Sequence, residues 1–268
     1  MTVTSGVGSA TRARIKERTL RTDRWWVPPL TTGAILAFFI VYATVRIFMN
    51  RWYFAPKYHY LTPIYSPCVN TTCVEGSSHL GHWFGAWPVF IPISLITFVV
   101  LAGFRGTCYY YRKAEYRSLL AAPAACAVPE PHKKYTGETK FPFVLMNFHR
   151  YFFYGALLFG LLNIWDGIQA FRGIDGGFGF GLGTLIIWVN LTMLWIYTLS
   201  CHACRHIVGG RLKHFSKHPL RYRYWTFVSK LNANHGRYAM ISLFTVILTD
   251  AYIMCVSANW FSDLRIVN

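Results

Sequence analysis

The sequence predicts an all-α, polytopic membrane protein, a bundle of five transmembrane helices. Three observations predict this fold class. The 268 residues are 54% hydrophobic and only 14% charged, whereas a soluble domain is about a quarter charged. Five apolar stretches each come close to the roughly 20 residues that cross a bilayer as a helix. Aromatic residues, which collect at membrane interfaces, make up 18% of the chain.

The predicted spans follow one another along the chain and are joined by short polar segments. They cover residues 26–49, 83–104, 148–171, 182–200 and 237–258. Residues 1–26 are basic and rich in hydroxyls and contain no apolar run, so we interpret them as a cytoplasmic tail. A mitochondrial transit peptide is the rival interpretation. Residues 27–268 then form one five-helix transmembrane domain.

The net charge of +17 is distributed unevenly. Three segments hold 21 Lys and Arg, and three others hold 4; the former are 1–26, 105–140 and 205–237, and the latter are 50–83, 171–181 and 261–268. Because positive residues favour the cytoplasmic side of a membrane, this division predicts the N-terminus inside and the C-terminus outside. Lipid headgroups explain most of the charge, and an acidic partner or soluble subunit also fits part of it. We expect no nucleic-acid binding.

Two loops carry cysteines outside the predicted spans. Cys68 and Cys73 lie close together in the outer loop, where an oxidising environment favours a disulfide over two free thiols. The inner loop contains a charge-free run, SLLAAPAACAVP, over residues 118–129. We expect this run to fold back on the bundle or to pack beneath a partner, and it carries Cys126 with it.

Most of the remaining cysteines, and several histidines, fall at one level of the predicted bundle. Ionisable groups and metal ligands in membrane spans are costly, so each is a functional hypothesis. Cys255 lies at the opposite end, and we interpret it as structural. The inner ends of the second, third, fourth and fifth spans carry, in order, Cys108; His149; Cys201, His202, Cys204 and His206; and His235.

Several kinds of centre would use such a set. Zinc accepts two thiolates and two imidazoles at one tetrahedral centre. A Rieske-type [2Fe–2S] cluster takes two Cys on one iron and two His on the other. A b-type haem needs only two facing His. Any single member also has a plain structural interpretation, because Cys is common as a small buried hydrophobe and His favours a helix C-terminus.

Five motifs resemble the single-chain membrane anchor subunit of actinobacterial succinate dehydrogenases, the SdhC type of respiratory complex II. The resemblance extends over most of the chain, from the first span to the fifth. The motifs are CYYYRKAEYR (108–117), PAACAVPEP (123–131), NFHRYFFY (147–154), CHACRHIVGGRL (201–212) and KLNANHGRYA (230–239).

The resemblance implies a subunit that sits in the bacterial plasma membrane beside a flavoprotein and an iron–sulfur subunit. It would pass electrons from the iron–sulfur subunit to menaquinone. Related five-helix anchors often hold two haems through four His. This chain departs from that pattern, since the first span has no His and the second has only His82 before its start. The mixed set therefore favours a Rieske-type [2Fe–2S] cluster, with haem b as the alternative cofactor.

We predict that two Cys and two His ligate this centre, with Cys204 and His206 in reserve. The candidate ligands are Cys108, Cys126 and Cys201, and His149, His202 and His235.

Four residues beside the ligands could donate hydrogen bonds to a quinone: Arg150, Arg205, Arg237 and Tyr238. The rival interpretation for each Arg is a side chain that reaches lipid headgroups. Asp166 and Asp250 lie in the outer halves of their spans, where a carboxyl either passes protons or joins neighbouring helices.

Two other functions stay open at this point. One is a purely structural anchor that binds zinc or no metal. The other is a transporter, which the lack of broken or paired short spans disfavours. The sequence also leaves open whether the complex forms a higher oligomer.

Overall fold

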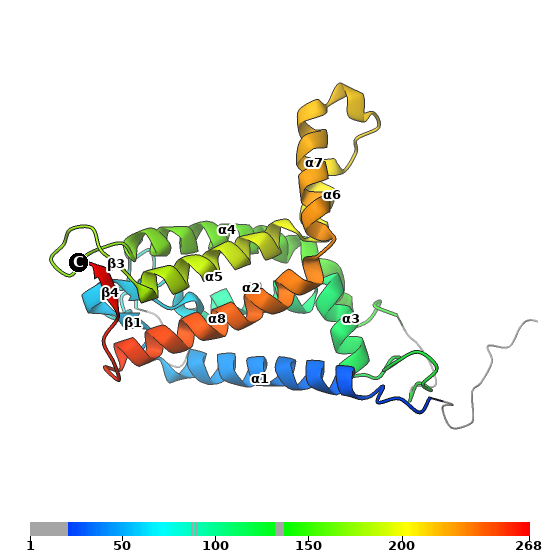
Figure 1. Ribbon diagram of the computed structural model, residues 1–268, viewed down its shortest axis with the longest axis horizontal. Helices are drawn as coiled ribbons and strands as arrows, with labels where there is room; N and C mark the ends of the chain where they lie inside the picture. The colour runs from blue at the N-terminus through cyan, green and yellow to red at the C-terminus, as the bar shows by residue number, and fades with distance from the viewer. Residues whose placement is uncertain (1–20, 87, 89–90, 132–136) are drawn as a thin grey trace, which may run out of the picture.

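The computed structural model describes residues 21–86, 88, 91–131 and 137–268, which are mostly helical. Five helices run side by side as a bundle (Figure 1). They are α1 (Val27–Met49), α2 (Ser94–Gly106), α4 (His149–Gln169), α5 (Leu182–Leu199) and α8 (His235–Ser257). Figure 1 also places the start of the described chain and the C-terminus at opposite ends of this bundle.

Four of the helices, α1, α4, α5 and α8, are long and apolar enough to cross a membrane. Their ends differ from the predicted spans by no more than two residues. Local signals fix these ends: for example, Pro residues stand at the start of α1, and Asn50 ends it in the left-handed conformation. The structure thus has the predicted membrane helices at four of the five positions.

The second predicted span differs from the structure. It was expected over residues 83–104, but α2 begins only at Ser94 and has 13 residues, which is about 20 Å of helix. A bilayer core is about 30 Å thick. Pro88 and Pro92 precede the helix, and each lacks an N–H and disfavours helix in the residue before it. The start of the predicted span is therefore wrong, although its C-terminal half is helical.

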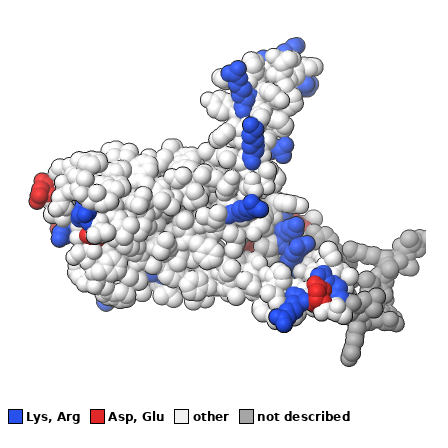
Figure 2. Space-filling model, viewed as in Figure 1, with Lys and Arg blue, Asp and Glu red and all other residues white. Residues whose placement is uncertain are grey.

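One end of the bundle, here called the arm end, carries three shorter helices. α3 (Tyr109–Ser118) lies across this end, and α6 (His202–Gly209) and α7 (Pro219–Asn232) project from it as an arm (Figure 1). Short 3-10 turns η3 (Phe143–Phe148) and η4 (Phe215–Lys217) complete it. On the face in Figure 2, Lys and Arg gather over the arm and beside α3.

The opposite end, here called the strand end, is covered by short strands and 3-10 turns. β1 (Phe54–Ala55) pairs antiparallel with β2 (Tyr60–Leu61), and β3 (Phe180–Gly181) pairs antiparallel with β4 (Arg265–Val267). The turns η1 (Pro56–Tyr58) and η2 (Pro63–Tyr65) flank β2. In the loop that follows, Cys68 and Cys73 form a disulfide with an S–S distance of 2.02 Å.

Close packing and one buried ion pair hold the bundle together. A Cβ at Gly103 of α2 would come within 2.4 Å of Phe152, and one at Gly155 of α4 within 2.5 Å of Val100. The two glycines therefore let α2 and α4 approach closely, as small residues do in membrane bundles.

The ion pair joins α1 to α8. Arg46 and Asp250 are 2.6 Å apart with side chains only 2% and 0% exposed, and Tyr42 donates to the same carboxylate. Of the two interpretations of Asp250, contact between helices is the one this geometry favours.

The charge-free run of the inner loop lies beside the start of α1. Arg21 donates to the carbonyl of Cys126 at 2.9 Å, and Trp25, Pro28 and Cys126 line one hollow. The run thus folds back toward the bundle, and Cys126 itself is exposed.

Candidate metal centre

Two cysteines and two histidines meet at the arm end because helix boundaries place them there. Cys108 stands between α2 and α3, and Cys201 between α5 and α6, each with extended backbone that ends one helix and begins the next. His149 and His235 are the first residues of α4 and α8. All four positions therefore lie at one level of the bundle.

The four side chains contact one another in two crossed pairs. Nε2 of His149 lies 2.8 Å from Sγ of Cys201, and Nε2 of His235 lies 3.1 Å from Sγ of Cys108. The two thiols also interact with each other electrostatically. Together they form a continuous group of two sulfurs and two ring nitrogens.

The hydroxyl of Thr107 fixes the His149 ring. Thr107 donates its proton to the carbonyl of Gly103 at 2.6 Å, so it must accept at its 3.0 Å contact with Nδ1 of His149. A hydroxyl has only one proton to give. Nδ1 therefore carries the imidazole proton, and Nε2 presents its lone pair to the sulfur.

The hydroxyl of Ser200 orients the His235 ring through the same kind of hydrogen bonds. Ser200 donates to the carbonyl of Tyr197 at 2.9 Å and accepts from Nδ1 of His235 at 2.7 Å. Both imidazoles are thus held in the tautomer that binds metals through Nε2, with the other nitrogen bonded to a neighbouring side chain, as is usual for metal-binding His.

The chemistry of this group fits a metal centre. Cys108 and Cys201 are each 1% exposed and His235 is 4% exposed, whereas His149 is half-buried and lines a cleft at the arm end. The donor types are two thiol sulfurs and two imidazole nitrogens, which are the types that zinc and a Rieske-type cluster bind. The sulfur–nitrogen distances are hydrogen-bond distances. As placed, the described residues include no group of three or more ligating side chains that could hold a metal ion, so these side chains must separate to admit one.

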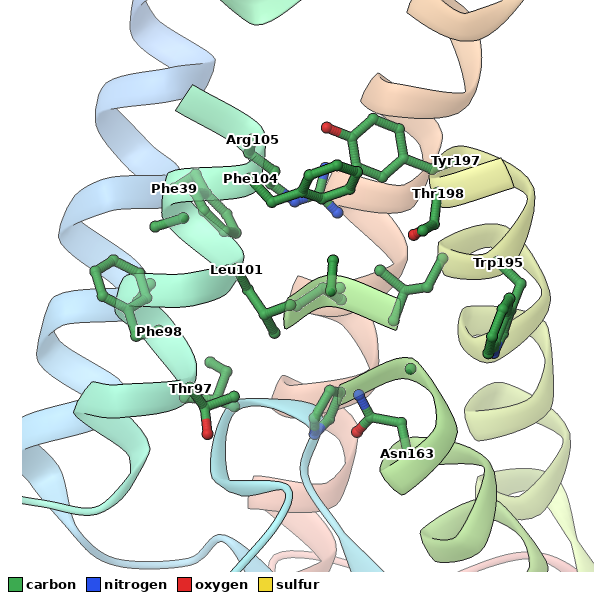
Figure 3. A pocket seen from close by; sticks show the side chains of 18 residues that line it. Phe39, Thr97, Phe98, Leu101, Phe104, Arg105, Asn163, Trp195, Tyr197 and Thr198 are labelled. Carbon is green, nitrogen blue, oxygen red and sulfur yellow. The ribbon is translucent and has the colours of Figure 1, made fainter. Parts of the chain in front are cut away.

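Two aromatic rings separate this group from a cavity within the bundle. Phe104 stacks on His149 with ring centroids 5.0 Å apart, and Tyr197 stacks on His235 at 5.1 Å. Both rings also line a mostly apolar cavity of about 90 Å³, which Figure 3 shows from close by. The cavity begins where the Cys and His group ends.

Arg105 lies at the same end of the cavity, as Figure 3 shows. It is 9% exposed, donates to Tyr111, Ser242 and the carbonyl of Ala239, and lies 4.7 Å from the Tyr197 ring centroid. Its contacts within the described part of the chain include no carboxylate. A buried cation therefore faces an apolar cavity.

Other predicted ligands lie outside the group of four. The ring centroid of His202 is 6.2 Å from that of His235, but His202 is exposed. Cys204 is buried in the core cluster that also contains Cys108 and Cys201, but it makes no contact with the two imidazoles in the described structure. His206 is exposed beside Arg150. Cys126 lies by the start of α1, and no contact joins it to the group. The structure thus assembles four of the six predicted ligands.

The predicted quinone-binding residues divide into two sets. Arg150 and Arg205 line an open cleft at the arm end, together with His149 and Trp225. Arg205 stacks over Trp225, 5.1 Å from its ring centroid.

Arg237 and Tyr238 do not line this cleft. Both belong to the first turn of α8, where Arg237 is exposed and Tyr238 is partly buried against the core.

Sequence reasoning missed five residues of this region: Phe104, Arg105, Thr107, Tyr197 and Ser200. One signal for two of them was present. In both segments a hydroxyl residue directly precedes the cysteine, as Thr107-Cys108 and Ser200-Cys201. The repeated pair could have been interpreted as support for the ligands. Nothing comparable distinguishes Arg105 from the other basic residues at the ends of the spans.

The fold and the site define a class: an integral membrane subunit with a group of two Cys and two His, three of them buried, at its basic end. Residues 27–259 match the family described as actinobacterial succinate dehydrogenase subunit SdhC. The chain belongs to this family. It is the membrane anchor subunit of succinate dehydrogenase, a succinate:quinone oxidoreductase, and a multi-pass protein of the plasma membrane.

A solved structure is similar over the full length. It is the Mycobacterium smegmatis Sdh1 complex in the apo form, with a TM-score of 0.90 and 58% sequence identity. The match covers 99% of this chain and 100% of that chain. No curated protein matches the sequence.

Proposed function

We propose that this anchor passes electrons from the iron–sulfur subunit to menaquinone through a Rieske-type [2Fe–2S] centre. The ligands would be Cys108, Cys201, His149 and His235. The observation that carries the proposal is the group of two thiols and two imidazoles, in which Nε2 of each imidazole is turned toward a thiol sulfur. A bound cluster would supply one-electron transfer at a potential above that of all-Cys clusters.

The donor set disfavours a b-type haem at this place. A haem held by two His needs the two rings to face each other across the porphyrin. Here Nε2 of each ring contacts a thiol, and one face of each ring is stacked on Phe104 or Tyr197. A haem iron bound by these two Nε2 atoms would have to displace both thiols.

The side chains around the two Cys and two His orient the imidazoles and enclose the group. Thr107 and Ser200 hold the imidazoles in the metal-binding tautomer. Phe104 and Tyr197 close the group toward the cavity and so limit access of water. Buried and hydrogen-bonded ligands of this kind tune the properties of a centre through their surroundings.

The basic arm end is the face that suits the soluble subunits. The family places the chain in succinate dehydrogenase, beside a flavoprotein and an iron–sulfur subunit. Lys and Arg of the arm and of α3 face outward at this end, and the Cys and His group lies directly beneath it. We infer that this end faces the cytoplasm, with five membrane-crossing segments, of which α2 and the loop before it form the second.

Two places are candidates for the quinone. The cleft lined by Arg150 and Arg205 opens at the arm end beside His149. The apolar cavity lies on the other side of the group, behind Phe104 and Tyr197, with Arg105 at its near end. We favour the cavity, because small-molecule sites are mostly apolar with few polar groups. In addition, electrons that enter at the arm end would then pass through the Cys and His group and reach the quinone on its far side.

A structural zinc site is the alternative function, since the same four residues suit zinc. The test is an assay of iron, acid-labile sulfide, zinc and haem on the purified complex, with EPR spectra of the reduced form. The proposal expects an additional [2Fe–2S] signal beyond those of the soluble subunit. Zinc in place of this iron would establish the structural alternative, and a stoichiometric b-type Soret band without the signal would establish the haem.

A further inference from the structure

Two carboxyls on the long helices are buried toward the strand end, and their partners differ. Asp250 of α8 pairs with the guanidinium of Arg46, and an arginine stays charged throughout the range that proteins meet. Asp166 of α4 instead lies 2.7 Å from Nδ1 of His79, with side chains 8% and 3% exposed. An imidazole can both accept and donate a proton at its ring nitrogens, so Asp166 has a partner with which it can share an exchangeable proton.

Polar groups continue from Asp166 to the cavity. Asn163 lies three residues earlier on α4, hence on the same face of the helix, and it lines the cavity at the end away from Arg105 (Figure 3). The hydroxyl of Ser66 donates to the second oxygen of Asp166. Ser66 follows Pro63 and Ile64, which also line the cavity. The carboxyl is thus one helical turn from the cavity wall.

Polar groups also continue from His79 toward the surface. Nε2 of His79 and Nδ1 of His59 are both buried and without a hydrogen-bond partner among the described residues, and the two ring centroids are 6.4 Å apart. A buried water needs such polar partners. His59 is half-buried, and burial together with the nearby Arg172 lowers its pKa. A neutral His59 can accept a proton from water at the strand end.

We propose that the His79–Asp166 pair delivers protons from the aqueous phase at the strand end to the quinone in the cavity. The inference rests on the proposed function. Succinate oxidation supplies two electrons, and the quinone takes these together with two protons to become the quinol. Each proton leaves the Asp166 carboxyl and forms an O–H bond on a quinone oxygen. The pair is then reprotonated through His59.

The experiment uses the whole complex in sealed liposomes that contain a quinone and a trapped pH dye. Succinate added outside reaches only the complexes whose dehydrogenase faces outward, so the strand end of every active complex faces the lumen. The proposal expects the lumen to become alkaline as quinone is reduced. Quinone reduction with proton uptake only from the external solution would overturn the proposal and leave the proposed function intact.

Variants separate the pair from general effects. Asp166→Asn should lower quinone reduction by roughly 100-fold, the scale of a lost general acid, and abolish alkalinisation. His79→Gln should act in the same direction if Asp166→Asn does not assemble. Reduction of a soluble dye by succinate and the EPR signal should stay unchanged in both. Asp175→Asn, at an exposed carboxyl of the same end, is the matched control.

The outcomes distinguish failure of the proposed proton transfer from failure of the proposed function. Wild-type rates of quinone reduction and luminal uptake in either assembled variant would refute the role of the pair. Unmutated complex that lacks the EPR signal, or that reduces dye but no quinone, would instead refute the proposed function.

Discussion

The ring of Phe104 lies parallel to the ring of His149, at an interplanar angle of 8° and a centroid distance of 5.0 Å. Phe104 thereby covers one face of a predicted ligand and, with its other side, forms the wall of the bundle cavity. Together with Tyr197, which stacks on His235, Phe104 separates the Cys and His group from the place that we propose for the quinone. Through this contact, the Cys and His group and the proposed quinone site adjoin each other within one bundle.

The hydroxyl of Thr107 should matter for metal retention. Thr107→Val removes the acceptor for Nδ1–H of His149 and leaves the ring free to change tautomer. Loss of a group that orients a ligand costs about 10–100-fold in metal affinity. We expect faster loss of iron from the purified variant in the presence of a chelator, measured by the decay of the EPR signal.

Thr192→Val is the control for this prediction, because Thr192 makes the same kind of bond to the preceding turn of its helix but lies on the exposed face of α5. An unchanged rate of iron loss in Thr107→Val would contradict the prediction, since the Nδ1–H tautomer of His149 would then not depend on Thr107.

The two histidines should be needed for quinone reduction and not for succinate oxidation. The double change His149→Ala and His235→Ala removes both imidazole ligands, so succinate-driven quinone reduction should be abolished. Reduction of a soluble dye should persist, because the flavoprotein is untouched. Spectra of the same preparation should show loss of the additional [2Fe–2S] signal; a variant that keeps that signal would exclude these residues as ligands.

Exposed His218→Ala, on the arm, is a matched control for the double change. It should reduce quinone at the rate of the unmutated complex.

The sequence predicted the elements whose signals are local. Four apolar spans end at prolines, glycines or polar residues, and their helices end there too. The second span was misjudged because apolar residues continue through Pro88 and Pro92, where composition indicates a span but backbone geometry forbids the helix. The inner level of Cys108, His149, Cys201 and His235 followed from the positions of the span ends alone.

Choosing among the candidates at that level needed three-dimensional contacts. Cys126 and Cys201 have equal standing as thiols in the sequence, but only Cys201 stands at a helix junction that faces the bundle interior. Arg105 resembles any basic residue at a span end, yet its side chain turns inward to Tyr111 and Ser242. Such choices depend on side-chain direction, which residue type and spacing do not specify.

Removal of Asp250 should destabilise the protein strongly. Asp250→Ala leaves the buried guanidinium of Arg46 without its carboxylate, and breaking a buried ion pair from one side costs about 3–5 kcal/mol. We expect a marked fall in the thermal midpoint of the detergent-solubilised complex. Glu75→Gln, at an exposed carboxyl, should leave the midpoint unchanged, and an equal midpoint for Asp250→Ala would mean that the pair contributes nothing.

The disulfide at the strand end should contribute to stability and not to electron transfer. Cys68→Ser with Cys73→Ser opens a loop with a sequence separation of 5, for which chain entropy predicts a loss of about 2 kcal/mol. We expect a lower thermal midpoint and an unchanged rate of quinone reduction, because both residues lie at the end opposite the Cys and His group. Mass spectrometry on protein from intact membranes should find the two thiols bonded, and free thiols there would contradict the prediction.

The arrangement of the chain across the membrane is the last prediction, and it underlies the direction of every transfer proposed above. The arm and α3 carry Lys and Arg in excess over the strand end, so the positive-inside rule places the arm end in the cytoplasm. The start of the described chain lies at the arm end and the C-terminus at the strand end. Reporter domains fused to the N-terminus and the C-terminus should therefore be active on the cytoplasmic and the outer side, respectively. Fusions that report both ends on one side would require an even number of crossings, and the second segment, where α2 is only 13 residues long, would then be the one that fails to cross.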